Sequence, residues 1–136
     1  MTDIPQYPLG ENSRDAISSA SGRRLSEITL EAVAGGELTS ADLQIRAETL
    51  RAQAHVAKQA GYAQLSENLL RAAELTVVPN DELLRMYETL RPGRASFAEM
   101  VAMAERLENT YSAIQNAKLV REAADVYLAR GLVRNA

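Results

Sequence analysis

Apolar residues recur at helical spacing near the centre of the chain. Leu83, Met86, Tyr87 and Leu90 follow the i, i+3, i+4, i+7 pattern that places side chains on one face of a helix. Asn80 stands before this run as a candidate N-cap, and a Pro-Gly pair after it ends the helix. The pattern therefore predicts one compact amphipathic helix in this region.

Two longer helices are predicted before it. The stretch 47–60 places Leu50, Ala54 and Ala57 on one face, and Gly61 then interrupts the pattern. Helical spacing resumes through a second apolar set, namely Tyr62, Leu65, Leu69, Ala72 and Ala73. A β-branched run then leads into a proline, and the residue before a proline disfavours the helical conformation, so we expect the second helix to end there.

The last third of the chain carries a long apolar stripe. A capping box of Ser96 and Glu99 predicts where its helix begins. The stripe consists of Met100, Met103, Leu107, Tyr111, Ile114, Ala117, Val120, Ala124 and Tyr127. One helix of this length is uncommon in a small domain, and turn-forming residues cluster at 109–112, so we expect a break there. The two methionines are interpreted as core residues.

Residues 1–24 show no helical pattern. Proline and glycine recur among Ser, Asn and Asp, which predicts an extended arm. Two interpretations stay open for this arm. It is either a frayed terminus or a segment that lies across a partner, with Tyr7 and Leu9 as anchors.

Two short helical segments are expected after the arm. Ser26 is a candidate N-cap for a short helix that ends at a Gly-Gly pair, and either Thr39 or Ser40 is suited to cap a turn that runs through Leu43. No segment shows the sustained alternation of a strand. The sequence thus predicts an all-α fold, an irregular array of four to six long and short helices with an extended N-terminal arm. We divide it into an arm over 1–24 and a single helical domain over 25–136.

Composition suggests that this domain has a thin core. Of the 136 residues 46% are apolar, but only 4% are aromatic, so the core relies on small and aliphatic side chains. Each alanine buries little area, and a thin core is often completed by a partner.

Charge and cysteine content narrow the function classes. The net charge is −3 and no basic stripe is present, which argues against a nucleic-acid partner. There is no apolar run of about 18 residues and no charged start followed by an apolar segment, so neither a membrane span nor a secretory signal is expected. The absence of cysteine removes disulfides and thiolate sites, and is compatible with a reducing cytoplasm.

No residue pattern indicates catalysis. His55 is the only histidine, it stands between Ala54 and Val56 within a predicted helix, and we interpret it as a structural or surface residue. No Gly-x-Ser-x-Gly elbow or phosphate loop is present. The carboxylates mostly have a basic residue three or four positions on, as in Asp42 with Arg46 and Asp81 with Arg85, which is typical of surface pairs.

Three arginines are candidates for a partner interface. Arg71, Arg91 and Arg94 flank the central helix pattern. They either place favourable charge near helix C-termini or form a rim that pairs with acids on another chain, because arginine is enriched at interfaces. Both interpretations stay open.

An ordered set of motifs runs along the chain from residue 7 to about residue 130. The motifs are Tyr7-Pro8-Leu9; Ile28-Thr29-Leu30-Glu31; Glu48-Thr49-Leu50-Arg51; Ala60-Gly61; Arg71-Ala72-Ala73-Glu74-Leu75-Thr76; Leu90-Arg91-Pro92; and Val120-Arg121-Glu122-Ala123-Ala124. This ordered set resembles one family, the small subunits of adenosylcobalamin-dependent diol and glycerol dehydratases.

The resemblance implies a role within a larger enzyme. It implies a dimer of heterotrimers with large, medium and small subunits, in which adenosylcobalamin lies between the large and medium subunits. It implies dehydration of propane-1,2-diol or glycerol to an aldehyde by a radical mechanism, a hydro-lyase reaction. The small subunit would brace the large one, with no catalytic, cofactor-binding or metal-binding residue of its own.

The resemblance leaves other properties open. It implies a bacterial, cytoplasmic enzyme, and relatives targeted to microcompartments resemble one another in a longer N-terminal extension. Only six residues precede Tyr7 here, so we expect any such address to lie on another subunit. Two alternatives are a free-standing helical adaptor and an independent hydrolase or lyase that uses His55. The choice between diol and glycerol stays open.

Overall fold

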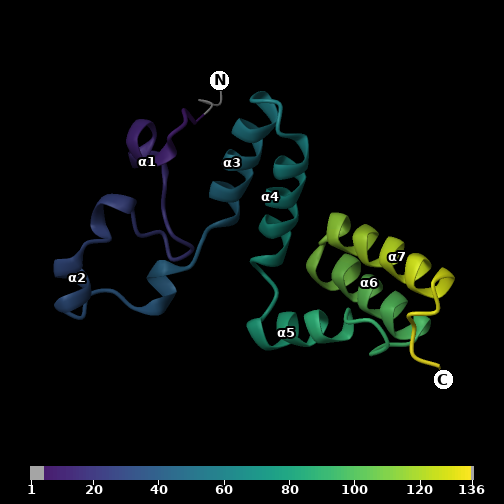
Figure 1. The fold of residues 1–136 in the computed structure, drawn as a ribbon. Coiled ribbons are helices and arrows are strands. Elements are labelled where there is room, and N and C mark those ends of the chain that lie inside the picture. The colour runs from purple at the N-terminus through teal and green to yellow at the C-terminus, as the bar shows by residue number, and fades with distance from the viewer. Residues whose placement is uncertain (1–4, 136) are drawn as a thin grey trace. The chain divides into compact units, whose positions relative to one another are not determined.

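The computed structural model describes residues 5–135. Within that range the regular secondary structure consists of helices, with no β-strand (Figure 1). The all-α prediction is confirmed. The α-helices are α1 (Leu9–Asn12), α2 (Leu30–Ala34), α3 (Ala47–Gln59), α4 (Ala63–Leu75), α5 (Asn80–Thr89), α6 (Phe97–Tyr111) and α7 (Ile114–Ala129). These seven exceed the expected four to six because the arm contains a single helical turn, α1, that was not predicted.

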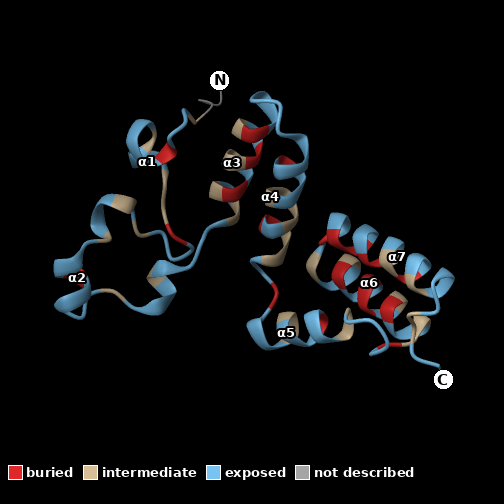
Figure 2. Cartoon of the chain, viewed as in Figure 1, coloured by how far each residue is buried: buried red, intermediate tan, exposed pale blue. Residues whose placement is uncertain are grey.

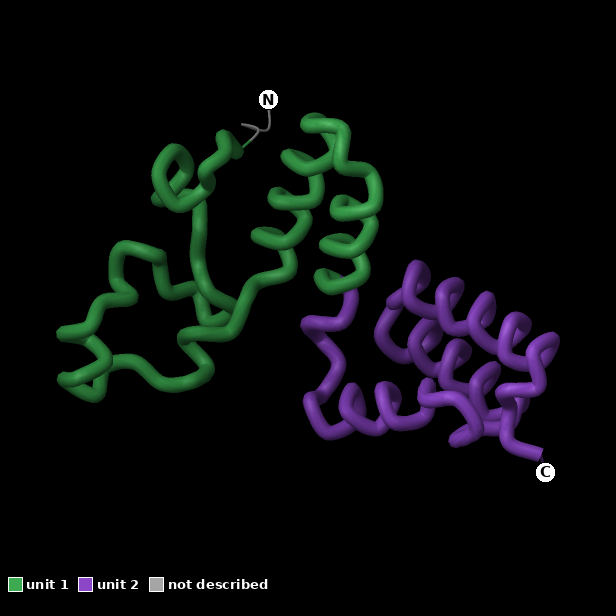
Figure 3. The backbone as a smooth tube through the Cα atoms, in the orientation of Figure 1, with its two compact units in different colours: residues 1–73 green, residues 74–136 purple. Residues whose placement is uncertain are grey.

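The contacts of the chain divide it into two compact units, residues 1–73 and 74–136 (Figure 3). We call them unit 1 and unit 2 and describe each by itself. The predicted boundary between arm and domain at residue 24 is a different division, and it stays a prediction.

The arm is less extended than expected. α1 and a 3-10 turn, Arg14–Ala16, occupy part of it, and an isolated bridge joins Ser18 to Arg24. Short-range bonds favour these turns: the Asn12 side chain donates to the Tyr7 carbonyl at 3.0 Å. The expectation of an arm without helix is therefore wrong for these turns, because local side-chain bonds outweigh the proline and glycine content.

The short helical segments after the arm differ from the prediction at one position, the N-cap of α2. Thr29, not Ser26, is the N-cap of α2, and its hydroxyl accepts the Ala32 N–H at 3.2 Å. Ser26 instead lies inside a 3-10 turn, Leu25–Glu27, which the Glu27 carboxylate closes by accepting the Arg24 N–H at 2.8 Å. The turn through Leu43 is confirmed as a 3-10 helix, Ser40–Leu43.

A glycine turn joins α3 to α4 in unit 1. Gly61 has φ +89°, a left-handed conformation that costs other residues free energy. Its N–H donates to the Lys58 carbonyl at 3.1 Å, and the Tyr62 N–H donates to the Ala57 carbonyl at 2.9 Å. This is the Schellman arrangement, which satisfies the last carbonyls of a helix. The predicted break at Gly61 is confirmed.

Unit 2 is built around the pair α6 and α7. Their buried faces meet in a seam rich in alanine, which we call the alanine seam: Ala104, Ala113, Ala117 and Ala124, each 1% exposed or less (Figure 2). Met100 is fully buried beside it, as the interpretation of a core methionine requires. Small side chains let the two helix backbones approach closely, and the larger residues fill the flanks of the seam.

Local signals set the ends of these helices. Ser96 and Glu99 form the predicted capping box, with the Ser96 N–H donating to the Glu99 carboxylate at 2.8 Å. The predicted break at 109–112 is confirmed at Ser112, which has φ +54° between α6 and α7. The predicted cap at Asn80 is wrong by one residue: Pro79 is the N-cap of α5 and Asn80 begins the helix.

A carboxylate from α4 caps α7. Ala113, the N-cap of α7, has no side-chain oxygen, so it cannot satisfy the free N–H groups of the first turn. Glu74 accepts the backbone N–H groups of Gln115 and Asn116, both at 3.0 Å, and the Asn116 side-chain amide at 2.7 Å. One carboxylate thus replaces a local cap and places negative charge at the positive end of the helix dipole.

We predict that Glu74→Ala lowers the free energy of unfolding by about 1 to 2 kcal/mol, because two backbone donors lose a charged acceptor. Urea denaturation followed by circular dichroism at 222 nm measures it. Glu67→Ala, at an exposed position of the same helix, is the matched control and should change stability by less than about 0.5 kcal/mol. Equal effects of the two substitutions would contradict the capping role.

Candidate subunit interface

The residues considered for catalysis are not assembled into a site. His55 is exposed on α3. Between residues 5 and 135, no group of three or more His, Cys, Asp and Glu side chains is arranged to hold a metal ion. In the same range, no helix is both long and apolar enough to cross a membrane.

The predicted surface ion pairs are confirmed only in part. Arg85 pairs with Asp81 at 2.5 Å. The pair Asp42 with Arg46 is wrong, because Asp42 accepts the backbone N–H of Thr39 at 2.9 Å, while Arg46 pairs with Glu48 at 3.0 Å. The carboxylate of Asp42 caps the 3-10 helix Ser40–Leu43, whereas its spacing from Arg46 had predicted an ion pair with that arginine.

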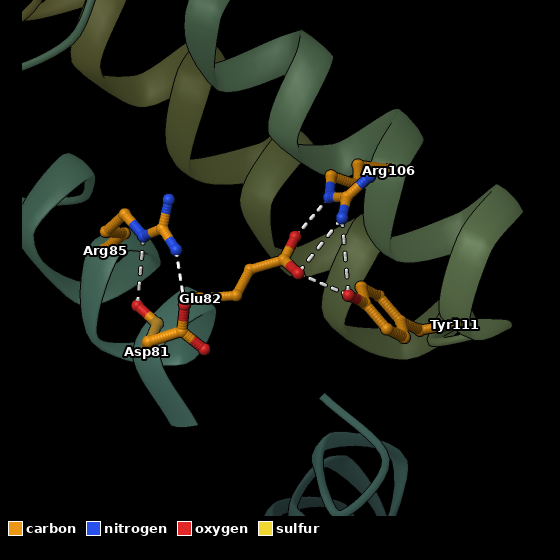
Figure 4. Close-up of polar contacts among 5 residues, drawn as sticks. All are labelled: Asp81, Glu82, Arg85, Arg106 and Tyr111. Atoms are coloured by element: carbon orange, nitrogen blue, oxygen red, sulfur yellow. Dashed lines mark hydrogen bonds and ion pairs between the residues drawn. The ribbon is translucent and has the colours of Figure 1, made fainter. Parts of the chain in front are cut away.

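One polar cluster in unit 2 was not predicted. Glu82 of α5 accepts hydrogen bonds from the Arg106 guanidinium and from the Tyr111 hydroxyl, both on α6 (Figure 4). Arg106 also lies over the Tyr111 ring, with its Cζ 5.6 Å from the ring centroid. Arg106 and Tyr111 are 24 and 29 positions from Glu82 in the sequence, so no local spacing reveals the cluster.

The electrostatics of this cluster indicate a structural role. We call the contact of Glu82 with Arg106 and Tyr111 the clasp. The hydrogen bond from Arg106, together with that from Tyr111, lowers the pKa of Glu82 to about 2. The hydrogen bond to Glu82 raises the pKa of Tyr111 and that of Arg106. Glu82 is therefore ionised at neutral pH and poorly suited to exchange protons. The cluster instead ties α5 to α6.

Unit 1 contains an apolar groove of about 660 Å³. The lining residues are mostly uncharged side chains of the arm and of the α3–α4 pair: Tyr7, Leu9, Gly10, Gln53, Val56, Ala57, Ala60, Tyr62, Leu65 and Leu69. The two arm residues chosen as anchors differ. Tyr7 is 75% exposed, whereas Leu9 is 8% exposed and forms part of the wall. Tyr7 thus offers most of its surface to a partner and Leu9 very little, and the interface role of both stays a prediction.

The three candidate arginines are in different surroundings. Arg71 is half-buried in unit 1, where it donates to the Asn68 side-chain oxygen on α4. Arg91 and Arg94 lie in unit 2 and are exposed, and both contact Glu88, with Nε to carboxylate distances of 3.4 Å and 3.5 Å. Arg91 and Arg94 therefore form one charged group, whereas Arg71 is bound separately.

Beside this charged group, α5 exposes two large apolar residues, Leu84 and Tyr87. Leu84, Tyr87 and Glu88 stand at i, i+3 and i+4 on one face of this helix, and Arg91 follows just after the helix ends, where it contacts Glu88. We call Leu84, Tyr87, Glu88 and Arg91 the outer face of α5.

Comparison with known proteins decides the family. Residues 2–134 match the family model described as dehydratase small subunit. The chain belongs to this family. Two relatives are the propanediol dehydratase small subunits of Salmonella typhimurium (strain LT2) and Citrobacter freundii. Each is 43% identical over 127 residues, which is 93% of this chain and 73% and 74% of the respective relative.

The resemblance drawn from the ordered motifs is therefore confirmed. The chain is a non-catalytic small subunit of a dehydratase, a hydro-lyase. Several motif residues have structural roles in this small subunit: Gly61 forms the turn after α3, Glu74 caps α7, and Ala73 is buried. This explains why a specific set of motifs carries no catalytic pattern.

The clasp predicts a pH-dependent stability of the small subunit. In the folded state the pKa of Glu82 lies below its ordinary value of 4.5. Its ionised carboxylate therefore stabilises the fold fully above pH 4.5, and this stabilisation is lost as the pH falls toward 2. We expect Glu82→Gln to lower the urea midpoint at pH 7 and to lower it much less near pH 2.5, where most of this stabilisation has been lost.

The matched control for this measurement is Glu105→Gln, at an exposed carboxylate on α6. It should leave the midpoint nearly unchanged at both pH values. A loss of stability in Glu82→Gln that is equal at pH 7 and pH 2.5 would show that the carboxylate charge is not what holds the clasp.

Proposed function

We propose that this chain is the small subunit of an adenosylcobalamin-dependent diol or glycerol dehydratase. The holoenzyme converts propane-1,2-diol to propionaldehyde and water, or glycerol to 3-hydroxypropionaldehyde and water. The observation that carries the proposal is the 43% identity, over 93% of the chain, to two propanediol dehydratase small subunits.

The chain acts in this enzyme as a brace for the large subunit. Bound adenosylcobalamin supplies the radical chemistry, and we assign its binding to the large and medium subunits in a dimer of heterotrimers. The contribution of this chain is therefore contact surface, for which Tyr7, Leu9, Arg71, Arg91 and Arg94 are the candidates.

The apolar surface of both units supports a bracing role. Beyond the groove in unit 1, seven large apolar residues of unit 2 are exposed: Val77, Leu84, Tyr87, Ile114, Leu119, Val126 and Leu128. Single exposed apolar residues are normal, but a helix face and a groove that are both apolar are typical of surfaces that a partner covers. We place the assembled enzyme in the bacterial cytoplasm.

Co-expression with a large and a medium dehydratase subunit tests the proposal. We expect the tagged chain to co-purify with the large subunit and the complex to dehydrate propane-1,2-diol when adenosylcobalamin is added. His55→Ala should leave turnover within about twofold of the wild type, because no catalytic step depends on it, whereas a catalytic base would lose about 100-fold. A monodisperse monomer that never co-purifies would favour a free-standing adaptor instead.

A further inference from the structure

The apolar face of α5 is wider than unit 2 covers. Leu83, Met86 and Leu90 pack into the core of unit 2. Tyr87 follows Leu83 by four residues and so lies beside it on the helix, but it is 59% exposed, and Leu84 is 68% exposed. A helix whose apolar face extends beyond the area that its own core covers presents the remainder to solvent or to a partner. Unit 2 thus leaves one edge of the apolar face of α5 uncovered.

The charges beside the outer face of α5 are unbalanced. Arg91 and Arg94 share the single carboxylate of Glu88, and each contacts it through Nε. Their side chains are 66% and 61% exposed. Two guanidinium groups on one carboxylate leave a net positive charge and N–H donors directed elsewhere. Arg85 on the same helix differs, because it has a carboxylate of its own in Asp81.

This combination of apolar and cationic groups indicates the chemistry of the surface that would bind it. Tyrosine and arginine are the residue types that most often dominate binding energy at interfaces. A guanidinium pair with one carboxylate accepts a second carboxylate with good geometry. The groove of unit 1 has an uncharged lining and therefore specifies no such chemistry.

We infer that the outer face of α5, together with Arg94, docks on the large dehydratase subunit. The complementary surface is apolar opposite Leu84 and Tyr87 and carries a carboxylate opposite Arg91 and Arg94. This inference rests on the proposed function and adds to it which helix face makes the contact.

Thiol labelling tests the location of the contact. The chain contains no cysteine, so Leu84→Cys introduces a single reactive site. In the free chain, N-ethylmaleimide should modify it quickly. In the complex, we expect modification at least about tenfold slower, because thiol reactivity depends on access. Asp125→Cys, at an exposed polar position on α7, is the matched control and should react at the same rate in both.

Charge reversal tests the chemistry of the contact. Arg91→Glu should weaken binding to the large subunit at least about 30-fold, as loss of a dominant interface residue does. The turnover of the complex that still forms at saturating small subunit should be unchanged. Lys118→Glu, the same charge change on α7 at a residue with its own partner Glu122, should bind like the wild type.

The outcomes separate this inference from the proposed function. If the wild-type chain does not assemble with a large subunit at all, the proposed function fails. If Leu84→Cys assembles but its thiol stays as reactive as in the free chain, the docking face is elsewhere and the inference is wrong. If the thiol of Leu84→Cys is labelled as slowly in the free chain as in the complex, this chain itself covers the site. The same conclusion follows if protection depends only on the concentration of the small subunit. Either result would also overturn the inference.

Discussion

The geometry of unit 2 depends on one carboxylate, that of Glu74. α7 begins at a residue that cannot cap it, so its first N–H groups need an acceptor from elsewhere in the chain. Glu74 provides it through three hydrogen bonds to two consecutive residues. Because those bonds have a fixed direction, they also orient the start of α7 relative to the segment around Glu74.

The small subunit combines a modest core with extensive apolar surface. Its buried side chains are mainly alanines with a few larger residues such as Met100 and Leu107. Polar clasps supplement this core, and the contact of Glu82 with Arg106 and Tyr111 joins α5 to α6 without apolar burial. A domain built this way remains folded while large apolar residues stay available on its surface. That property suits a chain whose function is contact with a larger subunit.

Sequence reasoning succeeded where the determinant is local. The turn at Gly61, the capping box at Ser96 and the break at Ser112 each depend on residues within one or two turns, and the motifs identified the family. It failed where a determinant is distant or competes with another. The Glu74 cap and the Glu82 clasp join residues that only tertiary packing brings together, and Asp42 serves a backbone N–H instead of the predicted arginine. The exposed faces could be suspected from composition, but only the structure separates Arg71 from Arg91 and Arg94.

The alanine seam has a consequence for how this family can diverge. At Ala104, Ala113, Ala117 and Ala124 the side chain is a single methyl group that is almost completely buried. A larger residue at any of these sites would overpack the core, and glycine would weaken the helix at the three sites that lie within α6 or α7. Substitution by a larger residue and, at the three helical sites, substitution by a smaller one are therefore both destabilising. Homologues should differ at the alanine seam only where a second substitution compensates for the first. The exposed faces of the same helices carry no such restriction.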